Sequence, residues 1–289
     1  MATIIPTTDI PLTQLHQAMT EAYSDYVVPM NISEAAFGSM LGGRSYDAES
    51  SRALLIDGQI AAFWLIGRND LTERGTHYCI SVGTLPDFRR RGLSEQIFAT
   101  LHSKAQESGV RKFVLECITT NDRALAAYKK LGFVVRRHVV VSRGPYERFS
   151  ASSSDVTLRD VSLAEAKSIS MQIGDWQPTW QNSFASFEAN LSDALFLVAE
   201  VQGHAVGLCG VLRATGQIKQ LCLVGDERRS QLGEHLLSHV GDLLGKKESG
   251  VYVNIDGSDL AVLDLLKRRG WEHYTSQYEM VYTLGKETP

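Results

Sequence analysis

The segment from Val82 to Glu95 constrains the fold most, because it joins a strand pattern to a helix pattern through a basic loop. Three consecutive arginines, Arg89 to Arg91, precede Gly92 in this loop. The first turn of a helix has unpaired N–H groups and the positive end of the helix dipole, and a glycine lets an anion approach the backbone. The segment therefore predicts either a turn that binds a pyrophosphate or a solvated, arginine-rich surface loop.

A second pattern lies further along the chain. Residues 113–121 form an apolar, β-branched run, and residues 122–131 have helical spacing and stop at Gly132-Phe133. A strand followed by a short helix with a glycine stop is therefore expected here.

Together the two patterns resemble the GNAT superfamily of acyl-CoA-dependent N-acetyltransferases. Arg89-x-x-Gly92-x-Ser94 is similar to the Arg/Gln-x-x-Gly-x-Gly/Ala signature of that family. The one departure is Ser94, where the family prefers Gly or Ala. Asn121 to Phe133 is similar to the family element Asn-x-x-Ala-x-x-x-Tyr-x-x-x-Gly-Phe.

The resemblance implies that acetyl-CoA is the co-substrate. In the family, the pantetheine pairs with the edge of the strand before the arginine loop, and the loop amides hold the pyrophosphate. The cofactor-binding residues implied in this way are Val82, Gly83, Thr84, Arg89, Arg90, Arg91, Gly92, Leu93, Ser94, Asn121, Ala124 and Tyr128. Gly83 is consistent with close backbone approach, although a β-bulge would also need a glycine.

Two side chains are candidates for acid–base catalysis. Tyr128 occupies the tyrosine position of the family element, and a phenol with a pKa of about 10 can protonate a departing thiolate. Without that element, a tyrosine on an amphipathic helix would be a core residue. Glu116 points away from Leu115 and Cys117 in an apolar strand run, toward a solvated face or a cleft, and is the candidate base. Several family members use water relays instead.

The acceptor site is expected near the first helix pair. Residues 1–50 contain six acidic side chains and the single base Arg44, which would suit a cationic acceptor. The loop that contains Tyr23, Asp25 and Tyr26 provides aromatic and acidic groups for an amine of moderate size. Solvated acidic helix faces and a hydrophobic plug between helices are the alternatives.

Composition bounds the other possibilities. The 289 residues suggest two domains, and 44% hydrophobic and 21% charged residues are typical of a globular protein. We expect a cytoplasmic protein without membrane partners, because no apolar run could span a bilayer and the N-terminus lacks signal-peptide features. The net charge of −4 argues against bulk nucleic-acid binding. The four cysteines lack paired metal-ligand spacing, so we expect reduced thiols and no metal. A monomer or homodimer is expected.

The order of the elements predicts a mixed α/β (α+β) sheet. The resemblance implies two GNAT-like domains, each a mixed, mostly antiparallel twisted sheet flanked by helices. The low-complexity segment 150–155 is expected to link a catalytic domain, 1–149, to a second domain, 156–289. The first half is expected to contain helices over 12–23, 33–41, 93–107 and 122–131, a hairpin over 53–66 turning at Asp57-Gly58, and strands over 76–84, 112–118 and 133–141. The second half is expected to contain a hairpin over 196–212 turning at Gln202-Gly203, strands over 218–224 and 251–255, and helices over 230–244 and 260–269.

The second half resembles a degenerate copy of the first. Three motif residues have different counterparts there: Gln231 for Gly92, Asp259 for Asn121, and Leu266 for Tyr128. A bulky side chain and a negative charge disfavour CoA, and a leucine cannot donate a proton. An unrelated α/β domain is the alternative.

The sequence thus predicts an acetyl-CoA-dependent N-acetyltransferase that acts on a small-molecule or peptide amine by direct attack in a ternary complex, with its active site in the N-terminal domain. The alternatives are a specialised small-molecule acetyltransferase of the mycothiol-synthase type and a non-catalytic acyl-CoA sensor. The mycothiol-synthase type is disfavoured, because its working site lies in the C-terminal repeat.

Overall fold

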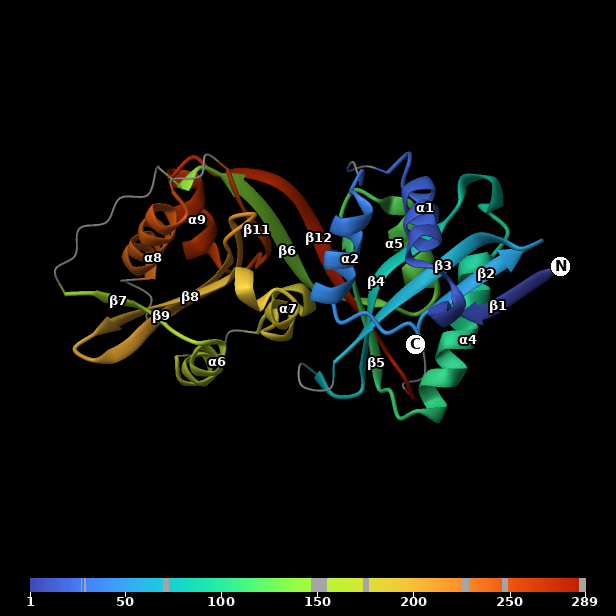
Figure 1. Ribbon diagram of the computed structural model, residues 1–289, viewed down its shortest axis with the longest axis horizontal. Coiled ribbons are helices and arrows are strands. Elements are labelled where there is room, and N and C mark those ends of the chain that lie inside the picture. The colour runs from blue at the N-terminus through green and yellow to red at the C-terminus, as the bar shows by residue number, and fades with distance from the viewer. Residues whose placement is uncertain are drawn as a thin grey trace. The chain divides into compact units, whose positions relative to one another are not determined.

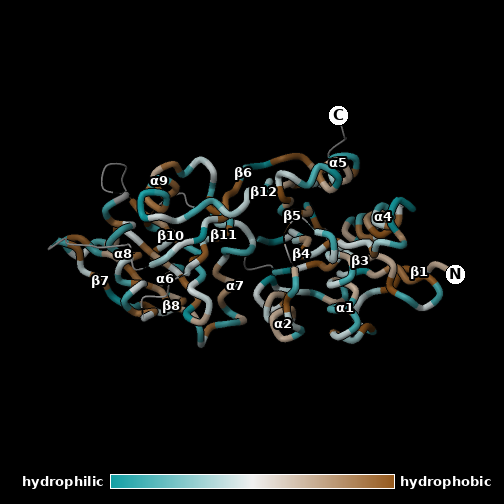
Figure 2. The backbone as a smooth tube through the Cα atoms, turned by 90° about the horizontal axis from the view of Figure 1, so that it is seen from above, coloured by the Kyte–Doolittle hydropathy of each residue, from teal (hydrophilic) through white to brown (hydrophobic). Residues whose placement is uncertain are grey.

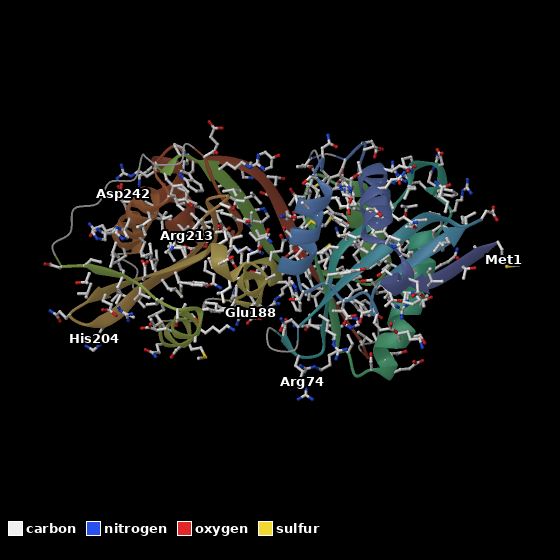
Figure 3. The ribbon with its side chains drawn as sticks, viewed as in Figure 1. Met1, Arg74, Glu188, His204, Arg213 and Asp242 are labelled. Atoms are coloured by element: carbon white, nitrogen blue, oxygen red, sulfur yellow. The ribbon has the colours of Figure 1, made fainter. Side chains whose placement is uncertain are left out.

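The computed structural model describes residues 1–26, 28, 30–69, 73–146, 155–173, 177–224, 229–245 and 249–285, without the side chains of residues 229 and 230. The chain forms two compact units (Figure 1). Unit 1 comprises Met1–Arg136 and Tyr278–Pro289, and unit 2 comprises Arg137–Gln277. Each is a mixed α/β unit. Charged side chains such as Arg74 in unit 1 and Asp242 in unit 2 point outward from the ribbon (Figure 3).

Unit 1 is a sheet with helices on both faces. Its strands are ordered β1-β2-β3-β4-β5-β12, where β12 is Glu272–Thr283 and belongs to this unit from Tyr278 on. The pairs β1–β2, β2–β3 and β3–β4 are antiparallel, and β4–β5 is parallel. The elements in chain order are β1 (Ala2–Pro6), η1 (Thr7–Asp9), α1 (Leu12–Ala22), α2 (Glu34–Gly43), β2 (Arg52–Ile56), β3 (Gln59–Arg68), β4 (Thr76–Thr84), η2 (Pro86–Phe88), α4 (Leu93–Glu107), β5 (Lys112–Ile118), α5 (Asp122–Lys130) and β6 (Val134–Gly144).

Local chemistry accounts for the boundaries of several of these elements. Asp57 and Gly58 both have positive φ, as a two-residue turn between twisted strands requires, and they join β2 to β3. The side chains of Ser33 and Asn121 each accept a backbone N–H in the first turn of the following helix. In Figure 2, α4 and α5 lie on one side of β3 and β4, and α1 and α2 lie on the other.

The two strands of the parallel pair separate. Thr76–Tyr78 of β4 pair with Lys112–Val114 of β5. Beyond this point the described structure records no pairing between them, although β4 continues to Thr84 and β5 to Ile118. β4 stays paired with β3 on its other edge. One edge of β4 is therefore open at its C-terminal end.

Unit 2 has a similar plan. Its strands are ordered β6-β11-β10-β9-β8-β7, with β10–β11 as the parallel pair. The elements are β7 (Thr157–Asp160), α6 (Leu163–Gln172), η4 (Trp180–Asn182), α7 (Ala185–Glu188), η5 (Leu191–Asp193), β8 (Ala194–Val201), β9 (His204–Leu212), β10 (Gln217–Leu223), α8 (Arg229–Leu243), β11 (Gly250–Asp256), α9 (Leu260–Arg268) and β12 (Glu272–Thr283). Gln202 and Gly203 have positive φ and join β8 to β9, as predicted.

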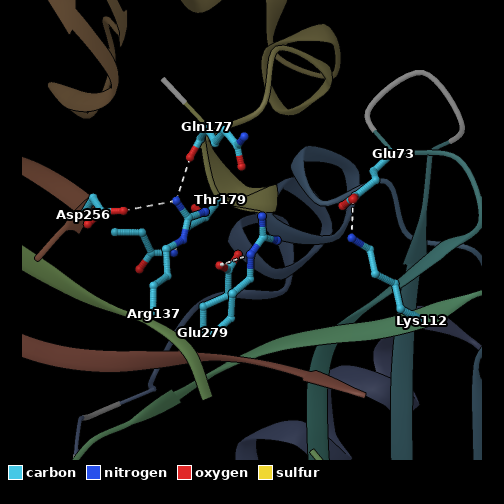
Figure 4. Close-up of polar contacts among 9 residues, drawn as sticks. Glu73, Lys112, Arg137, Gln177, Thr179, Asp256 and Glu279 are labelled. Carbon is cyan, nitrogen blue, oxygen red and sulfur yellow. Dashed lines mark hydrogen bonds and ion pairs between the residues drawn. The ribbon is translucent and has the colours of Figure 1, made fainter. Parts of the chain in front are cut away.

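The chain passes between the units within two strands, β6 and β12. Figure 2 shows β6 as hydrophobic stretches separated by a hydrophilic one, which contains Arg136 and Arg137. Arg136 forms an ion pair with the buried Glu279 of unit 1. Arg137 instead donates to the carbonyl oxygen of Gln177 and pairs with Asp256 of unit 2 (Figure 4). Successive arginines therefore belong to different units.

The C-terminal strand completes the core of unit 1. Met280 is fully buried in the cluster formed with α4, α5 and the strands of unit 1. The ring of Tyr282 packs against those of Phe98, Phe113 and Phe133. The compact units thus differ in extent from contiguous domains of 1–149 and 156–289. The predicted linker, 150–155, lies outside the described residues except for Asp155 and stays a prediction.

Candidate functional site

A pocket of about 420 Å³ opens in unit 1 at the C-terminal end of β4. Among the residues expected at the site, the lining residues are Tyr23, Asp25, Tyr26, Val82, Gly83, Thr84, Arg89, Arg90, Gly92, Leu93, Ser94, Asn121, Ala124 and Tyr128. Arg91 and Glu116 are not among the lining residues. The sequence analysis did not anticipate six others: Ala22, Phe88, Glu95, Arg123, Ala127 and Leu131. The pocket size is in the range of small-molecule sites.

The arginine loop forms a concave turn. Arg90 has φ of +64° and Gly92 has φ of +69°, so left-handed residues stand just before the first turn of α4. Turns of this kind direct successive N–H groups toward one point and bind anions. A Cβ atom at Gly92 would meet nothing within 4 Å, so the space above this turn is open.

The side chain of Arg91 does not take part in this concavity. Its guanidinium lies 5.3 Å from the centroid of the Phe88 ring and donates to the carbonyl oxygen of Asp87 at 2.8 Å. Arg91 is therefore folded back along its own turn.

The open edge of β4 presents its polar backbone groups to the site. The N–H of Leu85 donates to the carbonyl oxygen of Ala61 on β3, so the alternate residues Thr84 and Val82 face the other edge. On that edge three carbonyl oxygens accept side-chain donors: Ile80 from Arg44 at 3.3 Å, Val82 from Tyr23 at 3.0 Å, and Thr84 from Arg89 at 3.2 Å. The edge N–H groups therefore suit a ligand with hydrogen-bond acceptors.

Gly83 has a packing role that the sequence did not indicate. A Cβ atom at this position would lie 3.0 Å from the Cβ of Ala22 and closer still to the ring of Phe63. Glycine is required because α1 and the Phe63 ring pack directly on this strand.

Three tyrosines meet in the pocket, and Tyr128 differs from the other two. The Tyr23 hydroxyl donates to the carbonyl oxygen of Val82, and Tyr26 shares a hydrogen bond with Asn121. No described residue hydrogen-bonds the hydroxyl of Tyr128, whose ring packs edge-on against Trp64. Burial raises the pKa of Tyr128 well above its usual value, and it raises that of Tyr26 to about 12. Tyr128 is therefore a protonated donor that faces the pocket.

Trp64 is a supporting residue that the sequence analysis missed. Its fully buried indole donates to the Ser94 hydroxyl at 2.9 Å. Ser94, the residue that departs from the family signature, thus accepts a hydrogen bond from the buried indole of Trp64. This pairing crosses from β3 to α4, so no local sequence pattern could indicate it.

Asp25 and Arg89 form an ion pair at the edge of the pocket. The two carboxylate oxygens of Asp25 accept from the two terminal nitrogens of Arg89 at 2.6 and 2.7 Å. The hydrogen bond from Arg89 lowers the pKa of Asp25. Both oxygens of the carboxylate that was expected to attract an acceptor are therefore engaged within the protein.

Glu116 lies outside the pocket lining. It accepts a hydrogen bond from the hydroxyl of Tyr78, on the neighbouring strand β4. Its neighbours Leu115 and Cys117 pack in the core shared with α4 and α5, so Glu116 points to the opposite face, as its place in the strand predicts. Burial raises the pKa of Cys117 to about 12 and that of Cys79 further, so neither thiol is a ready nucleophile.

In unit 2 the corresponding strands also separate, but protein fills the gap. Gln217 and Ile218 of β10 pair with β11, and η4 then lies against both strands. The side-chain amide of Asn182 donates to the carbonyl oxygen of Val253 on β11, while the backbone carbonyl oxygen of Asn182 accepts from the side chain of Gln220 on β10. The chain thus bridges the two strands at the place where unit 1 has its open edge.

The motif counterparts in unit 2 agree with the sequence comparison at two places and differ at a third. Asp259 caps α9 as Asn121 caps α5, and Leu266 is buried in the core. Gln231 lies inside α8 rather than before it, because α8 begins sooner after its strand than α4 does. The buried faces of the two helices nevertheless match in the gapless comparison, because Leu232, Leu236 and Leu237 of α8 correspond to Leu93, Ile97 and Phe98 of α4. The turn itself, residues 225–228, lies outside the described residues.

The expectation of no metal took the histidines to lack a His-x-x-x-His spacing, but His235 and His239 have this spacing and stand one turn apart on α8. Among the residues that the structure describes, no group of three or more His, Cys, Asp or Glu side chains could hold a metal ion. None of the described helices is long and apolar enough to cross a membrane.

Comparisons with known proteins show which family and which folds this chain resembles. Residues 13–133 match the sequence model of the Acetyltransferase (GNAT) family, whereas no curated protein sequence matches the chain. Among solved structures, the fold is similar to a tandem GNAT protein from the clavulanic acid biosynthesis pathway, with a TM-score of 0.70 and 13% identity over 99% of this chain and 100% of that one. It is also similar to a GCN5-related N-acetyltransferase from Sphaerobacter thermophilus, with a TM-score of 0.69 and 14% identity over 98% of this chain and 95% of that one. Residues 13–133 therefore match the acetyltransferase (GNAT) family, and over nearly its whole length the chain has a fold similar to that of a tandem GNAT protein.

Proposed function

We propose that the protein transfers the acetyl group of acetyl-CoA to a primary amine of a small molecule or peptide, by direct attack in a ternary complex, in the pocket of unit 1. One observation carries the proposal. The pocket combines a left-handed turn at a helix start, an open strand edge and the phenol of Tyr128, to which no described residue forms a hydrogen bond. These features fit a pyrophosphate, an amide-containing chain and a thiolate leaving group, respectively.

The residues have distinct roles in the proposed reaction. When bound, acetyl-CoA supplies an activated thioester. The N–H groups around Gly92 and the first turn of α4 hold the phosphates, and the edge N–H groups of Val82 and Thr84 orient the pantetheine carbonyl groups. These contacts position the reacting carbonyl without contributing to the proton transfers.

Tyr128 and Glu116 are proposed to move the protons. The amine nitrogen forms a bond to the carbonyl carbon as the carbon–sulfur bond breaks. The amine loses a proton toward Glu116, directly or through water, and the sulfur gains a proton from Tyr128. The products are an amide and the free thiol of CoA.

The thiols near the pocket support direct attack over a covalent acetyl-enzyme. A cysteine nucleophile must be a thiolate, and burial keeps Cys117 protonated at physiological pH because it raises the pKa to about 12. Cys79 is further from ionisation for the same reason.

A panel of primary amines with detection of released thiol tests this function. At least one amine should release CoA and gain an acetyl group by mass. The matched variant Tyr128→Phe keeps the ring that packs on Trp64 but removes the proton, so it should bind CoA normally while kcat falls by about 10²–10⁴-fold. Binding of acetyl-CoA without turnover of any amine would instead favour an acyl-CoA sensor. A variant with full kcat would remove Tyr128 from the mechanism.

A further inference from the structure

The side chain of Arg89 contacts three other parts of unit 1. Its Nε donates to the carbonyl oxygen of Thr84 at the end of β4, at 3.2 Å. One terminal nitrogen donates to the carbonyl oxygen of Ala22 at the end of α1, at 3.0 Å. Both terminal nitrogens also bind the carboxylate of Asp25, in the segment that carries Tyr23 and Tyr26.

This arrangement uses most of the hydrogen-bonding capacity of the guanidinium. The fork geometry of arginine matches a carboxylate in a two-point pair, which a lysine cannot reproduce. The Arg89 side chain is only 18% exposed, whereas that of Asp25 is 63% exposed. Arg89 is therefore directed toward the end of α1 and away from the open space above Gly92.

We propose that Arg89 is a positioning residue that fixes the phosphate-binding turn to the segment Tyr23–Tyr26, with Asp25 as its anchor. One side chain then sets the shape of the cofactor turn and the place of Tyr23 and Tyr26, two of the three tyrosines that line the pocket. The ligands of the turn and of the segment Tyr23–Tyr26 rest on the proposed function, but the link that Arg89 makes between the two does not. Asp25 is accordingly an anchor and not a recognition group for a cationic acceptor.

The variant Asp25→Asn distinguishes an anchored Arg89 from an Arg89 that binds phosphate and from an Asp25 that recognises the acceptor. Each of the three roles predicts a different change in CoA affinity. If Arg89 is an anchored clamp, loss of the charge loosens the turn, and CoA should bind about three- to tenfold more weakly by calorimetry. If the Arg89 side chain binds phosphate and Asp25 competes for it, CoA should bind more tightly. If Asp25 recognises the acceptor, CoA affinity should stay unchanged and only the acceptor KM should rise. Either of the last two results overturns the proposal.

Glu21→Gln is the matched control. Glu21 is an exposed acid near the end of α1 and lies outside the pocket lining, so its loss changes the local charge equally but should leave CoA affinity unchanged. Arg89→Lys keeps the charge but not the fork, and should weaken CoA binding at least as much as Asp25→Asn.

Hydrogen exchange provides a readout that needs no ligand. The amides of Tyr23, Ser24 and Tyr26 donate to local carbonyl oxygens and should exchange faster when the clamp is broken. We expect exchange of this segment to rise about threefold or more in Asp25→Asn and Arg89→Lys, but not in Glu21→Gln. Unchanged exchange in both clamp variants would refute the tie. A parent protein that binds no CoA, yet shows this exchange pattern, would contradict the proposed function alone.

Discussion

Gly92 and Gly109 lie at the two ends of α4 in nearly the same backbone conformation, with φ of +69° and +72°. At both, an added Cβ would meet nothing within 4 Å. Alanine at either position should therefore cost a similar free energy of unfolding, about 1–2 kcal/mol, because an L-residue is strained in this region. The two glycines differ in that Gly92 lines the pocket and Gly109 does not.

This pair gives a controlled prediction about the phosphate turn. In Gly92→Ala the new methyl group should occupy the space proposed for the pyrophosphate, and CoA affinity should fall at least tenfold, about 1.4 kcal/mol. Gly109→Ala should lose stability in chemical denaturation and keep its CoA affinity in calorimetry. Equal affinity in both variants would mean that the phosphates bind elsewhere.

The pH dependence of the rate should distinguish the acid from the base. Because burial raises the pKa of Tyr128 well above its usual value, the phenol stays protonated, and the parent rate should not fall up to a pH of about 10. Glu116→Gln should lower the rate near neutral pH and recover as pH approaches the amine pKa, about 8–10, where the acceptor is already neutral. Tyr128→Phe should show no such recovery. A Glu116→Gln profile that superimposes on that of the parent would assign the base to an ordered water or to another carboxylate.

At the scale of elements, the gap between the two separating parallel strands is open in unit 1, between β4 and β5, and filled in unit 2, between β10 and β11. In unit 1 the open edge of β4 lines a pocket, whereas in unit 2 Asn182 and Gln220 join η4 to both strands. We therefore expect calorimetry to give one CoA site per chain. Gly92→Ala should weaken that site and leave no second tight one. Two equivalent sites in the parent would contradict this reading of η4.

Local signals explain which elements the sequence could predict. The predicted ranges 76–84, 93–107 and 112–118 coincide with β4, α4 and β5, because strand alternation, the turn at Gly92 and the helix period are all short-range. The Asp57-Gly58 and Gln202-Gly203 turns were predicted for the same reason. β1, β7, α6 and β12 were not predicted.

In the site, too, features set by a single segment could be predicted, whereas contacts between distant segments could not. The backbone features around Gly92 and Asn121 follow from their own segments, and the structure has the turn and the helix cap there. The side-chain partners do not follow in this way. Asp25 meets Arg89, and Tyr78 meets Glu116, only because helices and strands far apart in the sequence pack in a particular register. Pairwise contacts of this kind depend on the whole fold, so a single sequence does not reveal them.

At the scale of the whole molecule, the C-terminal strand makes the stability of unit 1 depend on residues at the far end of the chain. Met280 is fully buried, in the same core as Trp64 and Phe98. Val281, the next residue, is half-buried. The two positions thus offer a test of how β12 contributes to the N-terminal unit.

Met280→Ala should remove core contacts from unit 1 and leave a cavity, at a cost of about 2–5 kcal/mol in free energy of unfolding. Because a ligand stabilises the unit that binds it, the calorimetric transition that acetyl-CoA raises identifies unit 1. That transition should move to lower temperature in Met280→Ala, and by less in Val281→Ala, whose side chain loses less buried area. The proposed active site would then depend on a strand that enters unit 1 only after the chain has traversed unit 2. A ligand-sensitive transition that is unchanged in Met280→Ala would show that β12 is dispensable for unit 1.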